Sequence, residues 1–177
     1  MIIFITGFMM SGKSQIGSEL AGELNIPFID LDEALVQKKE ISIKEVILNQ
    51  GESEFRRLEF EVLKDLVKNA ENDLLIALGG GTMCSKHVSQ FVLENGVVVY
   101  LNRPESYFTD KVDDLIRTRP LFYDLEREKA VSKIQELMKQ RRPFYEKSQL
   151  QTLVNSGFSP KKLANSLKLL TNRPQSL

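Results

Sequence analysis

The sequence has no tryptophan, a single cysteine and no surplus of either charge. Cys84 has no partner for an internal disulfide, and its lone presence fits a reducing compartment. The 24 basic and 24 acidic residues balance, which removes any overall electrostatic attraction to nucleic acid or to an anionic membrane. No apolar run reaches the roughly 20 residues of a membrane helix, and the N-terminal run lacks the basic start and cleavage site of a signal peptide. These absences predict a cytoplasmic protein that binds neither nucleic acid nor membrane.

Length and composition predict one ordinary domain. Hydrophobic residues make up 42% of the 177 residues and charged residues 27%, which is typical of globular proteins and far from the composition of disordered ones. A second independent core would leave each half of the chain marginally stable. We therefore expect a single domain over residues 1–170, followed by a polar tail over residues 171–177. No exposed helical stripe predicts a stable dimer, so we expect a monomer.

Short apolar runs alternate with helical patterns along the chain. The runs lack a clean alternation of polar and apolar residues, as expected for strands that are covered on both faces. Apolar residues at four-residue spacing predict a helix over residues 15–24, and a stripe of apolar residues on one helix face predicts another over residues 53–67. This order predicts an α/β fold with a parallel sheet, whose ligands bind at the carboxyl ends of the strands. The predicted strands cover residues 2–5, 27–29, 74–78, 97–101 and 150–154.

Residues 7–14 fit the complete pattern G-x-x-x-x-G-K-[ST] of a phosphate-binding loop. The loop follows a predicted strand and opens a predicted helix, which is the context that the pattern requires. Its backbone N–H groups can hold phosphate oxygens, while Lys13 reaches the β- and γ-phosphates and Ser14 binds Mg²⁺. Because no guanine-reading Asn-Lys-x-Asp stretch occurs, ATP is favoured over GTP. The residues assigned to the nucleotide here are Gly7, Met10, Ser11, Gly12, Lys13, Ser14 and Gln15.

Two aspartates follow the second predicted strand. In extended geometry residues i and i+2 share a face, so Asp30 and Asp32 can both face the phosphate site. No other predicted strand ends in an aspartate suited to magnesium. The alternative role for Asp32 is to cap the helix that follows.

Three arginine-bearing segments are candidates for binding anions. Arg56 and Arg57 are adjacent on a predicted helix, so only one of them faces a cleft, and a surface ion pair is the alternative for either. Arg119 precedes a proline in a polar stretch where a lid over ATP would lie. Arg141 lies two residues before another proline that ends or kinks a helix, and its alternative role is to complement the helix dipole.

Gly79, Gly80 and Gly81 follow the third predicted strand directly. Three consecutive glycines lose backbone entropy on folding and contribute no side chain, so close approach of the backbone to a ligand explains them better than packing. A tight turn is the alternative. Cys84 and His87 nearby have no companions of a metal site or a catalytic triad, and we interpret them as incidental.

Together these motifs, in this order and spacing, resemble shikimate kinases over residues 2–170. The resemblance implies a three-layer α/β/α P-loop kinase fold with a five-stranded parallel sheet. It also implies a helical substrate-binding segment at about residues 32–62, a lid at about residues 110–125, and transfer of the γ-phosphate of ATP to the 3-hydroxyl of shikimate.

The family pattern also implies roles for individual residues. Lys13 and Ser14 contact phosphate and magnesium, with Asp30 near the metal through water. Asp32 holds the shikimate hydroxyls, and its action as a general base is a hypothesis. Arg119 is the lid cation on the phosphates. The shikimate carboxylate is bound by Arg56, Arg141 and the backbone of the triple glycine, Gly79, Gly80 and Gly81.

The sequence departs from the family pattern around the nucleotide. Met10 replaces a further glycine, and Gln15 replaces a threonine, so we expect altered ATP affinity. The usual adenine-stacking arginine is absent near Val112, where only Lys111 is close, and Phe158 lies in the other adenine-side loop. Alternatives are another small-molecule kinase of this fold, such as a gluconate kinase or a nucleoside monophosphate kinase, and a non-catalytic nucleotide-binding module.

Overall fold

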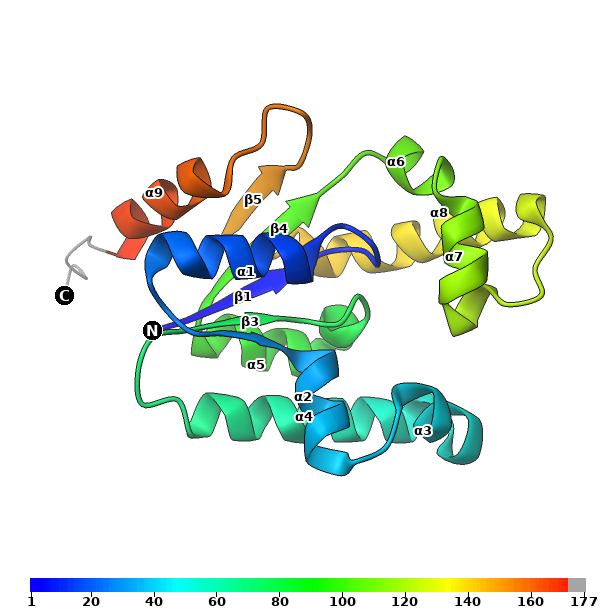
Figure 1. Ribbon diagram of the computed structural model, residues 1–177, viewed down its shortest axis with the longest axis horizontal. Helices are drawn as coiled ribbons and strands as arrows, with labels where there is room; N and C mark the ends of the chain where they lie inside the picture. Colours follow the sequence, from blue (N-terminus) through cyan, green and yellow to red (C-terminus); the bar gives the residue numbers. More distant parts are fainter. Residues whose placement is uncertain (172–177) are drawn as a thin grey trace.

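The computed structural model describes residues 1–171, so residues 172–177 of the predicted polar tail lie outside the described part. Five parallel strands form one sheet in the order β2-β3-β1-β4-β5. This confirms the predicted fold class (Figure 1). The strands are β1 (Ile2–Thr6), β2 (Phe28–Asp30), β3 (Leu74–Ala77), β4 (Val97–Asn102) and β5 (Leu150–Leu153).

Helices fill the connections between the strands. Those before β4 are α1 (Lys13–Leu24), α2 (Leu31–Lys39), α3 (Ile43–Gln50), α4 (Glu52–Lys68), the 3-10 turn η1 (Thr82–Cys84) and α5 (Lys86–Asn95). Those after β4 are α6 (Glu105–Thr109), α7 (Val112–Thr118), the 3-10 turn η2 (Pro120–Phe122), α8 (Arg127–Tyr145) and α9 (Pro160–Thr171). Within residues 1–171, no helix is long and apolar enough to cross a membrane.

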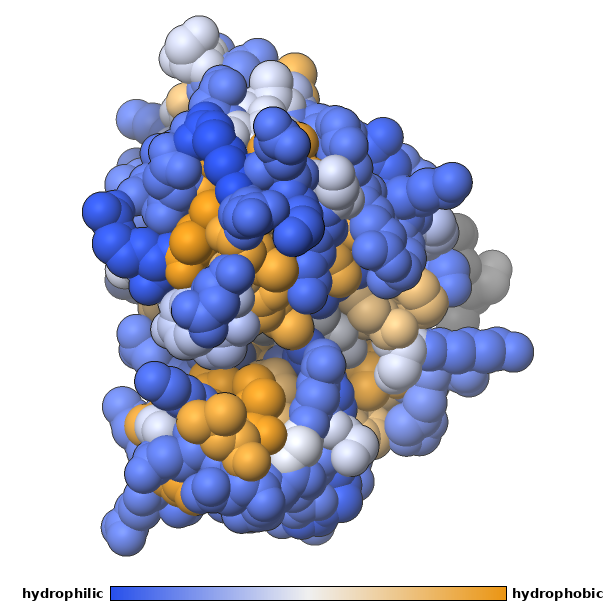
Figure 2. Space-filling view, turned by 90° about the vertical axis from the view of Figure 1, so that its right-hand side faces the viewer, coloured by the Kyte–Doolittle hydropathy of each residue, from blue (hydrophilic) through white to orange (hydrophobic). Residues whose placement is uncertain are grey.

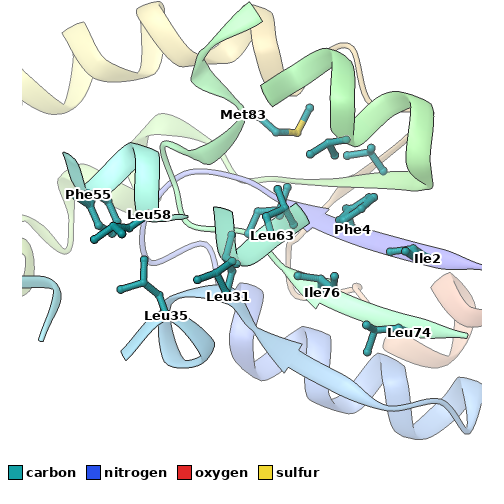
Figure 3. Close-up of a cluster of buried hydrophobic side chains, with 14 of the residues drawn as sticks. Ile2, Phe4, Leu31, Leu35, Phe55, Leu58, Leu63, Leu74, Ile76 and Met83 are labelled. Carbon is teal, nitrogen blue, oxygen red and sulfur yellow. The ribbon is translucent and has the colours of Figure 1, made fainter. Parts of the chain in front are cut away.

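The central strand β1 separates two apolar layers, because successive side chains of a strand point to opposite faces. Ile3 and Ile5 pack with α1 and α9 on one face. Ile2 and Phe4 pack on the other face with α2, α4 and α5 (Figure 3). Full burial of a side chain such as Phe4 contributes about 1.5 to 3 kcal/mol. The sheet is therefore covered on both faces, which explains the continuous apolar runs in its strands.

A third apolar cluster joins the phosphate loop to the segment predicted as a lid. Phe8 of the loop packs edge-on against Phe108, with ring centroids 4.9 Å apart. The same cluster includes Phe122 of η2 and Tyr145 at the end of α8. The phosphate loop, the lid segment and the last turn of α8 thus share one core, which fixes their positions relative to one another.

Candidate active site

The phosphate loop closes around Lys13. The ammonium group of Lys13 donates to the carbonyl oxygens of Gly7 and Phe8 at 3.1 and 3.0 Å. Gly12 caps α1 in the left-handed region, with φ 94°, a conformation that glycine adopts without strain. Burial lowers the pKa of Lys13 to about 8, an effect that nearby Asp32 opposes. The loop therefore presents a desolvated cation and a helix N-terminus to an anion, as predicted for a phosphate site.

Asp30 lies at the start of α2, against Ser14 of the phosphate loop. Its Oδ2 accepts from the Ser14 hydroxyl at 2.5 Å. Its Oδ1 accepts from the backbone N–H of Asp32 at 3.0 Å and of Glu33 at 3.5 Å, so Asp30 caps the helix. A carboxylate and a hydroxyl this close are the hard oxygen donors that Mg²⁺ prefers. The donor set fits the predicted magnesium site.

The predicted shared strand face of the two aspartates is wrong. Only Asp30 belongs to β2, whereas Asp32 lies in the first turn of α2. The alternative, that Asp32 caps this helix, is also wrong, because Asp30 does so. The turn of the helix still brings Asp32 beside Lys13, whose pKa it influences.

Asp32 is a largely buried carboxylate at the centre of the site. Its Oδ1 is buried without a hydrogen-bond partner among residues 1–171. Burial, together with the negative charges of Glu59 and Asp30, raises the pKa of Asp32 to about 6, while Lys13 acts in the opposite direction. An unpartnered acceptor of this kind is suited to a hydroxyl donor from a ligand.

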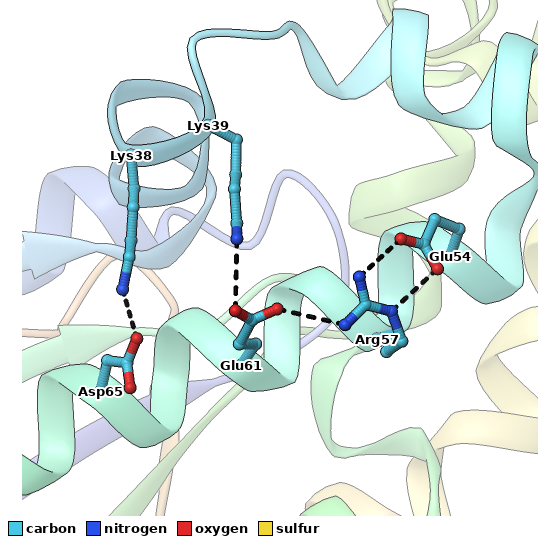
Figure 4. Close-up of polar contacts among 6 residues, drawn as sticks. All are labelled: Lys38, Lys39, Glu54, Arg57, Glu61 and Asp65. Atoms are coloured by element: carbon cyan, nitrogen blue, oxygen red, sulfur yellow. Dashed lines mark hydrogen bonds and ion pairs between the residues drawn. The ribbon is translucent and has the colours of Figure 1, made fainter.

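Arg56 and Arg57 diverge on α4 as predicted. The Nη1 of Arg56 donates to buried Glu59 at 2.8 Å, and its side chain lines a cavity of about 650 Å³. Arg57 faces solvent and pairs with Glu54 and Glu61 (Figure 4). Arg56 is therefore the arginine available to a bound anion.

Arg141 reaches the same cavity from α8. Its side chain is only 8% exposed, and Nη1 donates to the carbonyl oxygen of Gly80 at 3.3 Å. The Tyr145 hydroxyl donates to the same oxygen. The helix continues two residues past Pro143. The Arg141 side chain contacts the loop formed by Gly79, Gly80 and Gly81, here called the glycine loop, and not the C-terminal carbonyls of its own helix.

The three glycines allow three close approaches. A Cβ at Gly79 would lie 2.6 Å from the Glu59 carboxylate and 3.0 Å from Asp32, and one at Gly80 would lie 3.0 Å from the backbone nitrogen of Met9. A Cβ at Gly81 would lie 2.9 Å from Cζ of Arg56. The loop is thus packed against the charged groups of the cavity on one side and the phosphate loop on another, so closely that an added side chain must displace one of these neighbours.

The cavity brings together all six residues predicted to bind the acceptor. Its lining comes from the phosphate loop, α2, α3, α4, the glycine loop, the lid segment and α8, and includes Asp32, Arg56, Gly79, Gly80, Gly81, Arg119 and Arg141. Arg119 is exposed at its rim, and its charge contributes to the lowered pKa of Lys13. The volume of about 650 Å³ suits a small molecule.

Gln15 and Phe158, two of the predicted nucleotide contacts, lie outside both the phosphate loop and this cavity. The Gln15 side chain is exposed on α1 and donates to Glu19, one turn further on, at 3.1 Å. Phe158, in the loop before α9, packs against the apolar layer of α1 and α9. Their contacts with a nucleotide stay predictions.

The family model and the related sequences point to one family. The model of the shikimate kinase family matches residues 9–170. The shikimate kinase of Aquifex aeolicus is 36% identical over 150 residues, which cover 85% of this chain and 84% of that protein. The chain belongs to the shikimate kinase family. As a member of this family it is an ATP-dependent kinase.

Solved structures of shikimate kinases share the fold along nearly the whole chain. The enzyme from Bacteroides thetaiotaomicron superposes with a TM-score of 0.83 at 26% identity, covering 97% of this chain and 98% of that one. The shikimate kinase from Acinetobacter baumannii, solved in complex with shikimate, gives a TM-score of 0.81 at 29% identity, with 96% and 92% covered.

Glu59 is a residue of the shikimate kinase site to which the sequence analysis assigned no role. It is 2% exposed, and its two oxygens accept from Arg56 and, at 2.6 Å, from the Thr82 hydroxyl. It therefore holds the Arg56 guanidinium against the cavity. The sequence could have predicted this pairing. Glu59 is a charged residue within the apolar stripe of α4, and it follows Arg56 by three residues, which places the two side chains on the same helix face.

We expect Gly81→Ala to weaken acceptor binding while leaving the fold intact. The added methyl displaces the end of the Arg56 side chain, which is flexible, so the backbone is not forced to move. The Michaelis constant for the acceptor should rise about tenfold through loss of a charge-assisted hydrogen bond, with that for ATP unchanged. Steady-state kinetics and thermal unfolding measure both effects.

Gly22→Ala is the matched control for this substitution. Gly22 lies in α1, and a Cβ there would meet nothing within 4 Å. It should leave both Michaelis constants unchanged and stabilise the protein slightly, by about 0.5 to 1 kcal/mol. An unchanged Michaelis constant for the acceptor in Gly81→Ala would show that acceptor binding does not depend on the position of the Arg56 side chain.

Proposed function

We propose that this enzyme transfers the γ-phosphate of ATP to the 3-hydroxyl of shikimate, giving shikimate 3-phosphate and ADP. The observation that carries the proposal is the cavity in which two arginines and a carboxylate face one another beside a phosphate loop. Family membership, and the A. baumannii relative solved with shikimate, support the choice of acceptor.

Arg56 and Arg141 are suited to the acceptor's carboxylate. A guanidinium offers parallel N–H donors that match a carboxylate, and both arginines line the cavity. The acceptor can also approach the backbone of the glycine loop closely, because the three glycines have no side chains to keep it away. A nucleoside monophosphate or gluconate makes different demands: the former needs space for a base, and the latter is an extended chain. A compact ring acid uses all of these groups at once.

Asp32 is suited to the acceptor's hydroxyl. Its unpartnered Oδ1 accepts a hydrogen bond from the attacking hydroxyl, and the carboxylate takes up the proton as the phosphate is transferred. Lys13 and Arg119 offset the charge on the transferring phosphate, since phosphoryl transfer depends on positioning and charge neutralisation more than on covalent chemistry.

Ser14 and Asp30 would hold Mg²⁺, which when bound supplies positive charge to the phosphate oxygens. Every group assigned a role comes from one chain, so we also propose that the enzyme works as a monomer. The cytoplasm supplies the ATP that the reaction needs, and we place the enzyme there.

The test is ADP release from MgATP in a coupled assay. Shikimate, gluconate, AMP and CMP are offered separately, with water as the control. We expect release with shikimate only, and release at least about a hundredfold slower with Asp32→Asn protein prepared in the same way, which excludes a contaminating kinase. Release with another acceptor would establish a kinase of different specificity. A folded protein that binds ATP but releases nothing with any acceptor would be a nucleotide-binding module.

A further inference from the structure

Arg103, directly after β4, contacts three segments that surround the nucleotide site. Its Nε donates to the carbonyl oxygen of Ser11 in the phosphate loop at 2.9 Å. Its Nη1 donates to the carbonyl of Val154, which precedes the loop that contains Phe158, at 3.3 Å. Its guanidinium also stacks on Tyr107 of α6, 4.1 Å from the ring centroid. One side chain therefore ties together residues that are 92 and 51 positions away in the sequence.

The remaining nitrogen of Arg103 lies at the start of α1. A Cβ on Gly12 would lie 3.6 Å from Nη2, and Gly12 is the residue that caps this helix. No hydrogen-bond acceptor for Nη2 is found in residues 1–171. This nitrogen is therefore free to bind a ligand in the phosphate loop.

The charge of Arg103 has no carboxylate partner within the described part of the chain, although most other arginines there have one. A cation beside a helix N-terminus faces the positive end of the helix dipole, which is unfavourable without an anion between them. A nucleotide phosphate supplies that anion. A second cation, Lys111, also lies over the Tyr107 ring, 5.3 Å from its centroid.

We propose that Arg103 is a nucleotide-positioning residue of this kinase. It fixes the phosphate loop against the loop that follows β5, and its Nη2 binds the nucleotide's phosphate chain on the side away from the acceptor cavity. Arg103 does not line that cavity, so its contribution is to the nucleotide and not to the acceptor. The inference rests on the proposed function only in taking ATP as the phosphate donor.

The test is binding of MgADP by isothermal titration calorimetry, without any acceptor, which keeps it independent of the choice of shikimate. Arg103→Gln should bind MgADP about tenfold or more weakly, since it loses charge-assisted hydrogen bonds. Its Michaelis constant for shikimate should stay within about twofold of the parent value, because Arg103 lies outside the acceptor cavity. Arg57→Gln is the matched control, because Arg57 is an exposed arginine on α4. This variant should bind MgADP with the affinity of the parent.

Arg103→Lys separates positioning from folding. Lysine keeps the positive charge beside the helix but cannot bridge two carbonyl oxygens with a planar fork. Its affinity for MgADP should therefore lie between that of the parent and that of Arg103→Gln. Unchanged MgADP binding in both variants would overturn the proposal. So would an equal loss of nucleotide and shikimate affinity with a lowered unfolding temperature, because that indicates general destabilisation. Failure of the parent protein to phosphorylate shikimate, with MgADP binding still dependent on Arg103, would contradict only the proposed acceptor.

Discussion

Asp32→Asn is expected to remove nearly all turnover and, at neutral pH, to make the protein more stable. An amide cannot take up the proton of the attacking hydroxyl, and general bases contribute about 10² to 10⁴ in rate. The stability gain follows from burial, which raises the pKa of Asp32 to about 6. A buried carboxylate without a partner opposes folding whenever it is charged, and asparagine carries no charge.

The stability difference between Asp32→Asn and the parent should depend on pH. Asp32 has a higher pKa in the folded protein than its ordinary value of 3.8. Its contribution to stability is therefore fully present below the ordinary value and is lost as the pH rises to about 6. The variant lacks this loss, so it should exceed the parent by up to about 3 kcal/mol near neutral pH and match it in acid.

Urea unfolding at several pH values measures the stability difference. Glu33→Gln is the matched control, because Glu33 is an exposed carboxylate in the same helical turn, and it should change neither stability nor turnover. A stability gain that persists unchanged in acid would show that the charge of Asp32 is not its cause.

The parent enzyme should show a related pH profile. The value of kcat/KM for ATP should rise through about pH 6 as Asp32 ionises and fall above about pH 8 as Lys13 loses its proton. The acidic limb should be absent from the residual activity of Asp32→Asn, which a pH series of initial rates would show. An acidic limb that persists in the variant would assign that titration to another group.

The fold could be predicted from the sequence because its signals are local. Burial on both faces produces continuous apolar strands, and each predicted strand overlaps an observed one, although β2 is only Phe28–Asp30. The phosphate loop was predictable for the same reason, since one segment of eight residues contains the whole pattern.

The positions of the site residues were harder to predict where a helix begins. The Asp-x-Asp motif indicated an extended segment, yet Asp30 caps a helix that starts one residue later. A local signal for this was present, because an aspartate followed three residues later by Glu33 resembles a capping box. The contacts of Arg103 had no such signal, since its partners are brought close only by the order of the strands in the sheet.

Arg56→Leu should weaken shikimate binding by about 2 to 5 kcal/mol, which is a factor of roughly 30 to several thousand in its Michaelis constant. The loss has two parts. The carboxylate loses a charge-assisted partner, and the buried Glu59 carboxylate, freed from Arg56, now repels it. The Michaelis constant for ATP should change little, because Arg56 lies in the acceptor cavity.

Arg57→Leu provides the matched control, since it removes the same type of residue from the neighbouring position on α4. Within residues 1–171 Arg57 pairs with Glu54 and Glu61 on the surface. Exposed pairs contribute about 0 to 1 kcal/mol, so shikimate kinetics should be unchanged. Arg56→Lys adds a second test, because it keeps a positive charge beside Glu59 but loses the planar fork. It should fold normally and lose part of the affinity. Equal losses for shikimate and ATP in Arg56→Leu, with Arg56→Lys fully active, would show that Arg56 stabilises Glu59 and does not bind the carboxylate.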